Sequence, residues 1–78
     1  MSDTQLRQAL RAYVEAENLI AQLRAAHVDV SDEEARQPYT IMAVLFRHEI
    51  NIGEALATME KVLKKLKAVA EREGGANG

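Results

Sequence analysis

His48 is the residue whose type and position most directly suggest chemistry. It falls in mid-helix on an otherwise apolar stripe, and Glu49 follows it directly. If two helices pair antiparallel around the central connector, Glu17 and Asn18 lie roughly level with Asn51. The sequence therefore predicts a polar core layer made of Glu17, Asn18, His48, Glu49 and Asn51.

This layer could bind a metal ion or hold the helices in register. Di-iron helical bundles place carboxylates and Glu-x-x-His pairs on their inward faces. Here His48 and Glu49 are adjacent, so their side chains point about 100° apart on a helix. A buried polar residue on an apolar seam more often specifies alignment. We therefore expect a hydrogen-bonded layer and no cofactor, with a metal- or small-ligand-binding bundle centred on His48 and Glu49 as the alternative.

The remaining reactive side chains fit structural roles better than catalytic ones. The chain has no Cys, and Ser2 and Ser31 are both placed to cap helices. His27 falls in the last turn of a predicted helix, where positive charge complements the helix dipole. Tyr13 and Tyr39 lie on apolar stripes, as core tyrosines with a hydroxyl at the rim do. With no glycine-rich phosphate loop either, the sequence predicts a non-enzymatic protein.

The lysines of the segment Lys61–Lys67 raise the possibility of nucleic-acid binding. They lie toward a helix C-terminus, where cations are favoured, and Glu60 and Glu71 flank them. The formal net charge is −2, and no recognition-helix pattern accompanies the lysines. We expect no nucleic-acid binding, and a small nucleic-acid-associated regulator remains an alternative.

Length and composition predict one small domain that needs a partner. The chain has 78 residues, of which 47% are hydrophobic and 28% charged. Chains this short usually add disulfides, a metal or a second subunit to a small core. The absence of Cys excludes disulfides and suits a reducing compartment. No apolar run approaches the ~20 residues of a membrane span, and the N-terminus does not resemble a signal peptide, so we expect a cytoplasmic protein without membrane contact.

The helical periodicity predicts a single hairpin domain, residues 1–73, built from two long antiparallel helices. The first helix spans about 3–27, with Ser2 and Gln5 as a capping box. The connector spans 28–37. Inside it, Ser31 and Glu34 form a second capping box that starts one short helical turn.

The second helix is predicted to run from Pro38 to about residue 73, because proline suits the first position of a helix. A flexible tail, residues 74–78, follows. Asn51 and Glu54 have the spacing of a third capping box, which would begin a new helix after a break. The apolar stripe keeps its phase across this segment, so the sequence favours one continuous helix.

The first half of this second helix carries two apolar stripes. One stripe faces the first helix and contains Leu45, Ile52, Met59, Val62 and Leu66. The other contains Tyr39, Ala43, Phe46, Ile50, Gly53 and Ala57. A helix that is apolar on all sides must be covered on all sides, and one neighbouring helix covers only one of them.

The second stripe is therefore the predicted interface, and its simplest partner is a second copy. Two hairpins would form a homodimeric four-helix bundle. The function that follows is a protein–protein interaction module, a small adaptor, regulatory or chaperone-like subunit. A foreign helical protein partner is the alternative.

Overall fold

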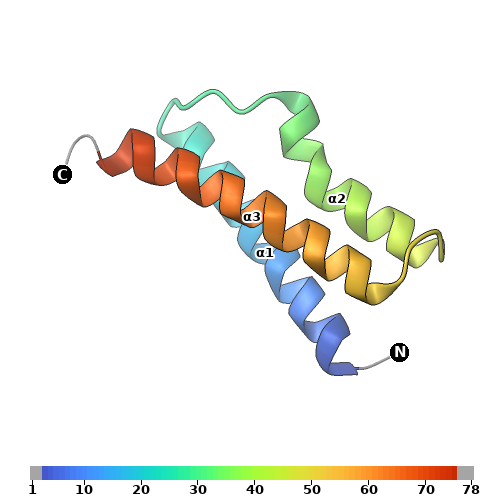
Figure 1. Ribbon diagram of the computed structural model, residues 1–78. Helices are drawn as coiled ribbons and strands as arrows, with labels where there is room; N and C mark the ends of the chain where they lie inside the picture. Colours follow the sequence, from blue (N-terminus) through green and yellow to red (C-terminus); the bar gives the residue numbers. More distant parts are fainter. Residues whose placement is uncertain (1–2, 76–78) are drawn as a thin grey trace.

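The chain folds into three helices rather than a two-helix hairpin (Figure 1). The structure, a computed structural model, describes residues 3–75, and side-chain burial is described as far as residue 72. The helices are α1 (Asp3–Ala25), α2 (Asp32–Phe46) and α3 (Ile52–Gly75). Helices α1 and α3 run in the same general direction and α2 runs opposite to both (Figure 1).

The predicted helix 38–73 is wrong because the chain reverses at residues 47–51. Helix α2 ends with His48 in the left-handed region, at φ 61°. The His48 amide donates to the Leu45 carbonyl at 3.0 Å, and the Glu49 amide donates to the Val44 carbonyl at 3.0 Å. These two bonds form a Schellman motif, which satisfies the last carbonyls of the helix.

The third capping box, which the periodicity argued against, starts α3. The Asn51 Oδ1 accepts from the Glu54 amide at 2.8 Å, and the Asn51 Nδ2 donates to Glu54 Oε1 at 3.1 Å. Because the chain reverses at residues 47–51, α3 runs in the same general direction as α1 (Figure 1), whereas the hairpin prediction made it antiparallel. The apolar residues keep one helical spacing across residues 47–51 because α2 and α3 both contribute to the same core. Such a spacing therefore does not require a continuous helix.

We expect Asn51→Ala to lower the free energy of unfolding by about 1 kcal/mol, because it removes the cap of α3. Urea denaturation followed by circular dichroism measures this loss. Asn51→Asp keeps an accepting oxygen and serves as the control. An unchanged midpoint for Asn51→Ala would show that the cap does not hold α3 in place.

Helix α1 ends at Ala25 by the same device, two residues before the predicted boundary. His27 has φ 63°, its amide donates to the Arg24 carbonyl at 3.0 Å, and the Val28 amide donates to the Leu23 carbonyl at 2.9 Å. Both histidines of the chain thus occupy the residue after a helix C-terminus where glycine is usual.

We expect His48→Gly to stabilise the chain by about 0.5–1 kcal/mol, since glycine adopts positive φ without a Cβ clash and only part of this gain is lost to unfolded-chain entropy. Thermal unfolding measures the gain. His48→Ala is the matched control, because it removes the same imidazole and retains the Cβ. Equal effects of the two substitutions would assign the change to the ring instead of to the backbone.

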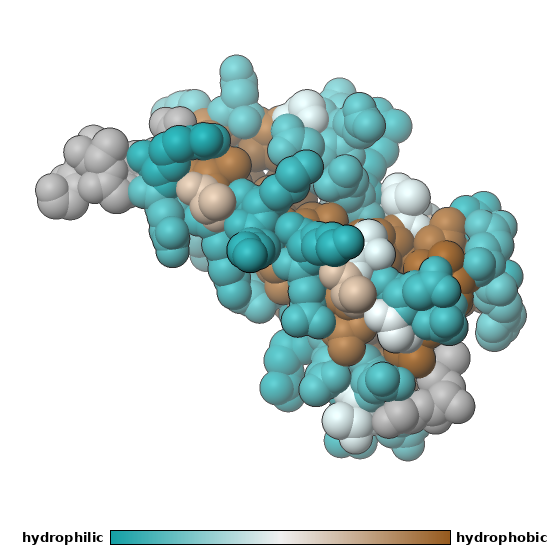
Figure 2. Space-filling view, in the orientation of Figure 1, coloured by the Kyte–Doolittle hydropathy of each residue, from teal (hydrophilic) through white to brown (hydrophobic). Residues whose placement is uncertain are grey.

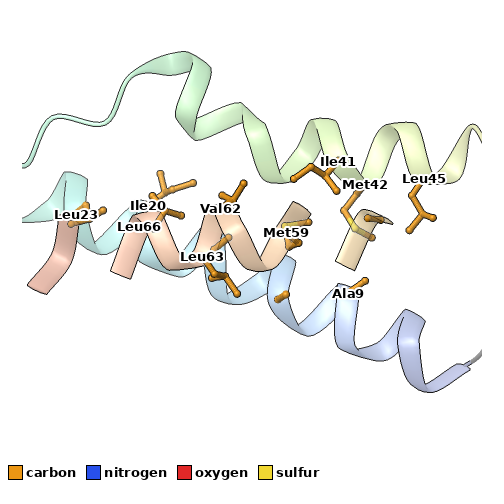
Figure 3. Packing of buried hydrophobic residues seen from close by; sticks show 13 residues of the cluster. Ala9, Ile20, Leu23, Ile41, Met42, Leu45, Met59, Val62, Leu63 and Leu66 are labelled. Atoms are coloured by element: carbon orange, nitrogen blue, oxygen red, sulfur yellow. The ribbon is translucent and has the colours of Figure 1, made fainter. Parts of the chain in front are cut away.

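Helix α2 begins six residues before the predicted boundary, so the predicted connector 28–37 is also wrong. Ser31 Oγ accepts from the Glu34 amide at 3.1 Å, which confirms Ser31 as the N-cap of the predicted box. The Glu34 carboxylate accepts at 3.1 Å from the Ser31 hydroxyl, whereas the capping box predicts a bond from the Ser31 backbone amide. This box starts the whole of α2, not a single turn. Pro38 lies inside the helix, where it removes the bond to the Glu34 carbonyl, and the ribbon bends in this half of α2 (Figures 1 and 3). Burial of the Pro38 ring, less than 2% exposed, offsets that loss.

The hydrophobic core lies between all three helices (Figure 3). Ile41, Met42 and Leu45 point from α2 toward the other two helices (Figure 3). Met59, on α3, is 0% exposed and is among the largest fully buried side chains. The core also contains Ala9, Ala12, Ala16, Ile20 and Leu23 of α1 and Ala55, Val62, Leu63 and Leu66 of α3.

Helix α1 makes its most extensive contact with α3. Its buried positions Ala9, Ala12 and Ala16 carry only methyl groups, so the backbones can approach closely. Lys67 Nζ lies 3.1 Å from Glu15 Oε1 and joins these two helices at the surface. The first part of α1 therefore contributes small residues to the core, and its last part contributes the larger Ile20 and Leu23.

The remaining predictions concern the two ends and the membrane. The predicted capping box of Ser2 and Gln5 cannot be compared with the structure, because Ser2 lies outside the described residues. Of the predicted tail 74–78, Gly74 and Gly75 are the last residues of α3 and 76–78 lie outside the described range. No helix within the described residues is long and apolar enough to cross a membrane.

Candidate interaction surface

Among the described residues, the large apolar side chains that remain exposed lie on α1 and α2. Leu10 is 41% exposed, Val14 54%, Tyr39 65% and Phe46 62%. Within the described residues α3 exposes none of this kind. Figure 2 views the molecule with α3 in front, and hydrophilic side chains dominate the outer surface there. Among the described residues, the exposed large apolar side chains are thus confined to two of the three helices.

Tyr39 and Phe46 lie on one side of α2. They are two helical turns apart and point within about 20° of each other at about 100° per residue. Ala43, half-buried, lies between them on the same side. Gln37 and Thr40 line a groove between α2 and α3, and their side chains leave α2 in directions different from those of Tyr39 and Phe46. Tyr39 and Phe46 consequently face away from α3.

Leu10 and Val14 lie one turn apart on α1, on the side nearer to α2. Arg24 shows where α2 lies, since its Nη2 is 3.5 Å from Asp32 Oδ1 and 3.3 Å from the Val30 carbonyl oxygen, to which it donates. At about 100° per residue Leu10 points within about 40° of Arg24, and Val14 within about 80° of it. The two helices therefore present their exposed apolar residues on one side of the bundle. We call this surface, formed by Leu10, Val14, Tyr39, Ala43 and Phe46, the α1–α2 face.

Three residues of the predicted interface do not belong to this face. Ile50 is half-buried in the α2–α3 loop and packs against the core. Gly53 and Ala57 are exposed but lie on α3, because the loop separates them from the α2 stripe. A Cβ at Gly53 would lie 3.3 Å from the Asn51 Oδ1, so this glycine accommodates the cap of α3.

The residues of the predicted polar core layer are exposed. Glu17 and Asn18 lie on the surface of α1, and His48, Glu49 and Asn51 lie in the α2–α3 loop. No polar or charged residue is buried within the described part of the chain. The predicted layer assumed a helix through residue 51, and the reversal of the chain there removes it from the bundle.

The polar groups of the loop serve the turn itself. Glu49 Oε1 lies 3.7 Å from Arg47 Nε, in a solvent-exposed pair. His48 supplies positive φ, and Asn51 caps α3. Across the residues described, no group of three His, Asp or Glu side chains is arranged to hold a metal ion.

The lysines of segment Lys61–Lys67 do not form an isolated basic patch. All are exposed, and Lys67 is paired with Glu15. Glu60 and Glu71 line the same hollow as Lys64 and Lys67 on the surface of α3. Acidic and basic side chains therefore alternate along this part of the helix.

A groove of about 600 Å³ lies between α2 and α3. Ile41 and Val62 contribute its apolar lining, and the polar lining consists of Glu33, Arg36, Gln37, Thr40 and Thr58. This groove exists only when α2 folds back along α3, so the hairpin predicted from the sequence did not contain it. Residues 33–37 belong to the predicted connector, so the sequence did not indicate that any of them lines a groove.

The site and fold define a small three-helix bundle with one exposed apolar face. Comparisons with known protein families, with characterised proteins and with solved structures give no significant match. The function is therefore inferred from the surface alone.

Proposed function

We propose that the chain is a non-enzymatic protein–protein interaction module, a small adaptor or regulatory subunit, that binds through its α1–α2 face. The observation that carries this proposal is the confinement of all four exposed large apolar side chains to that face. Apolar residues scattered singly over a surface are ordinary, whereas a contiguous group marks an interaction site.

The rest of the molecule supports the same function. The core is completed within the chain by Met59 and its neighbours, so Tyr39 and Phe46 are not needed to fill it. An exposed aromatic pair on a rigid helix supplies large contact area at a small entropic cost on binding.

The double substitution Tyr39→Gln/Phe46→Gln tests this proposal. Because both side chains are exposed, we expect the free energy of unfolding in dilute solution to change by less than about 0.5 kcal/mol. The association of the chain, measured by sedimentation velocity at increasing concentration, should decrease. Leu45→Gln, at a neighbouring buried position that is 3% exposed, is the matched control and should lose about 2–4 kcal/mol.

A loss above about 2 kcal/mol in the double variant would overturn the proposal, since surface substitutions rarely cost so much. In that case Tyr39 and Phe46 would serve the fold and not a partner.

A further inference from the structure

We propose that the partner of the α1–α2 face is a second copy of this chain, related by a twofold axis that pairs α1 with α1 and α2 with α2 in antiparallel fashion. This inference rests on the proposed function, because it names the occupant of the same surface. It differs from the hairpin dimer expected from the sequence, in which α3 residues took part.

The exposed side of α1 carries a self-complementary series of residues. Six exposed residues recur at steps of four and three, as in a helix–helix seam. The series is Asp3, Arg7, Leu10, Val14, Glu17 and Ala21. Its centre is apolar and its two flanking positions carry opposite charges.

The charges match only when the two copies of α1 run antiparallel. A twofold axis level with residue 12 places Leu10 of one copy opposite Val14 of the other, because these positions are equally far from the axis. It also places Arg7 opposite Glu17, twice per dimer. A parallel pairing would oppose Arg7 to Arg7 and Glu17 to Glu17, which is unfavourable. In the described residues neither Arg7 nor Glu17 forms an ion pair within the chain.

The same twofold axis also pairs the apolar residues of α2 with those of its copy. The ion pair between Arg24 and Asp32 sets these residues level at one end of the two antiparallel helices. Twelve residues back along α1 is residue 12, and twelve residues forward along α2 is residue 44, since both helices rise about 1.5 Å per residue. The midpoint of Tyr39 and Phe46 falls within about two residues of that level. One axis therefore opposes Tyr39 to Phe46 of the other copy and brings the two Ala43 methyl groups close.

The resulting assembly is a four-helix core made of α1 and α2 from both copies, with α3 on the outside of each. The arrangement covers all four exposed large apolar side chains and leaves the charged outer surface of α3 in water. A net charge of only −2 per chain offers little repulsion to association of two copies. A twofold interface also needs one surface only, which this chain has.

A charge-reversal cycle tests the pairing. Arg7→Glu and Glu17→Arg should each weaken the dimer about tenfold or more at low salt, because each creates two like-charge contacts. The double substitution Arg7→Glu/Glu17→Arg should restore affinity. Within one helix the two positions are about 15 Å apart, so rescue can arise only between copies. Lys61→Glu, an equal charge reversal on the exposed side of α3, is the matched control and should leave the dimerisation constant unchanged.

Cysteine cross-linking tests the direction independently. The chain has no Cys, so Arg7→Cys and Glu17→Cys each carry one thiol. In an oxidised equimolar mixture we expect the mixed 7–17 disulfide to predominate. The like 7–7 and 17–17 disulfides should be minor, because in the antiparallel dimer those positions are about 15 Å apart and a disulfide needs Cα atoms within about 7 Å.

Predominance of like disulfides, or a double charge variant as weak as the single ones, would overturn the antiparallel pairing. A wild-type chain that stays monomeric at about 1 mM in sedimentation equilibrium would overturn the second copy as the partner. Failure of the antiparallel pairing leaves the proposed function untouched. A monomeric wild type would remove the self-association that Tyr39→Gln/Phe46→Gln is expected to weaken, and the proposed function would then be judged by whether that variant remains folded at wild-type stability. Loss of stability in that variant is the separate result that would overturn the proposed function.

Discussion

Met59→Ala should lower the free energy of unfolding by about 3 kcal/mol, within the range of about 2–5 kcal/mol measured for such core truncations. Met59 is 0% exposed and lies where α3 meets the other two helices (Figure 3). Removing its side chain leaves a cavity that short helices close only in part. A domain of this size has a total stability on the order of 4–12 kcal/mol, so a loss of this size shifts the midpoint strongly.

Chemical denaturation of the wild type and of Met59→Ala measures this loss. Val14→Ala is the matched control, because it also shortens an apolar side chain but at a position that is 54% exposed. It should change the stability of the dilute chain by less than about 0.5 kcal/mol. Equal losses for the two variants would contradict a core centred on Met59.

Ala16→Leu should destabilise the chain by about 1–3 kcal/mol although leucine is the more hydrophobic residue. Ala16 is 0% exposed, on the side of α1 where Ala9 and Ala12 are also buried. The closeness of α1 to α3 depends on these methyl groups, and a longer side chain must separate the helices or leave its preferred rotamer.

The control for this substitution is Ala57→Leu, at an exposed position of α3. Leucine and alanine both favour helix, so this change should be close to neutral. Thermal unfolding of both variants by circular dichroism compares them directly. A stabilised Ala16→Leu would mean that the contact between α1 and α3 contains unfilled space.

Much of the local structure was readable in the sequence. Ser31 and Asn51 cap helices at the spacing noted in the sequence, because a cap depends on side chains only three residues away. At Asn51 the apolar stripe had nevertheless favoured a continuous helix. The all-α class and the course of α1 were predicted for the same reason. The exposed pair Tyr39 and Phe46 was also identified, since α2 keeps their relation within one helix.

The direction of the chain after residue 46 was not readable, and with it the number of helices. A stripe of period 3.6 records which residues are buried but not whether the helix between them is continuous. His48 did not predict the end of α2. Positive φ after a helix is adopted mostly by glycine or asparagine, and a histidine there is uncommon.

Tertiary packing decided the reversal at residues 47–51. The single turn predicted at Ser31 became the full helix α2 because Pro38, Ile41, Met42 and Leu45 could all be buried against α1 and α3. In a continuous helix, the side of α2 that carries Ile41, Met42 and Leu45 would not be packed against α3. Local chemistry thus set where helices can begin, and the burial of apolar surface between distant segments decided that there are three helices and which polar residues stayed in water.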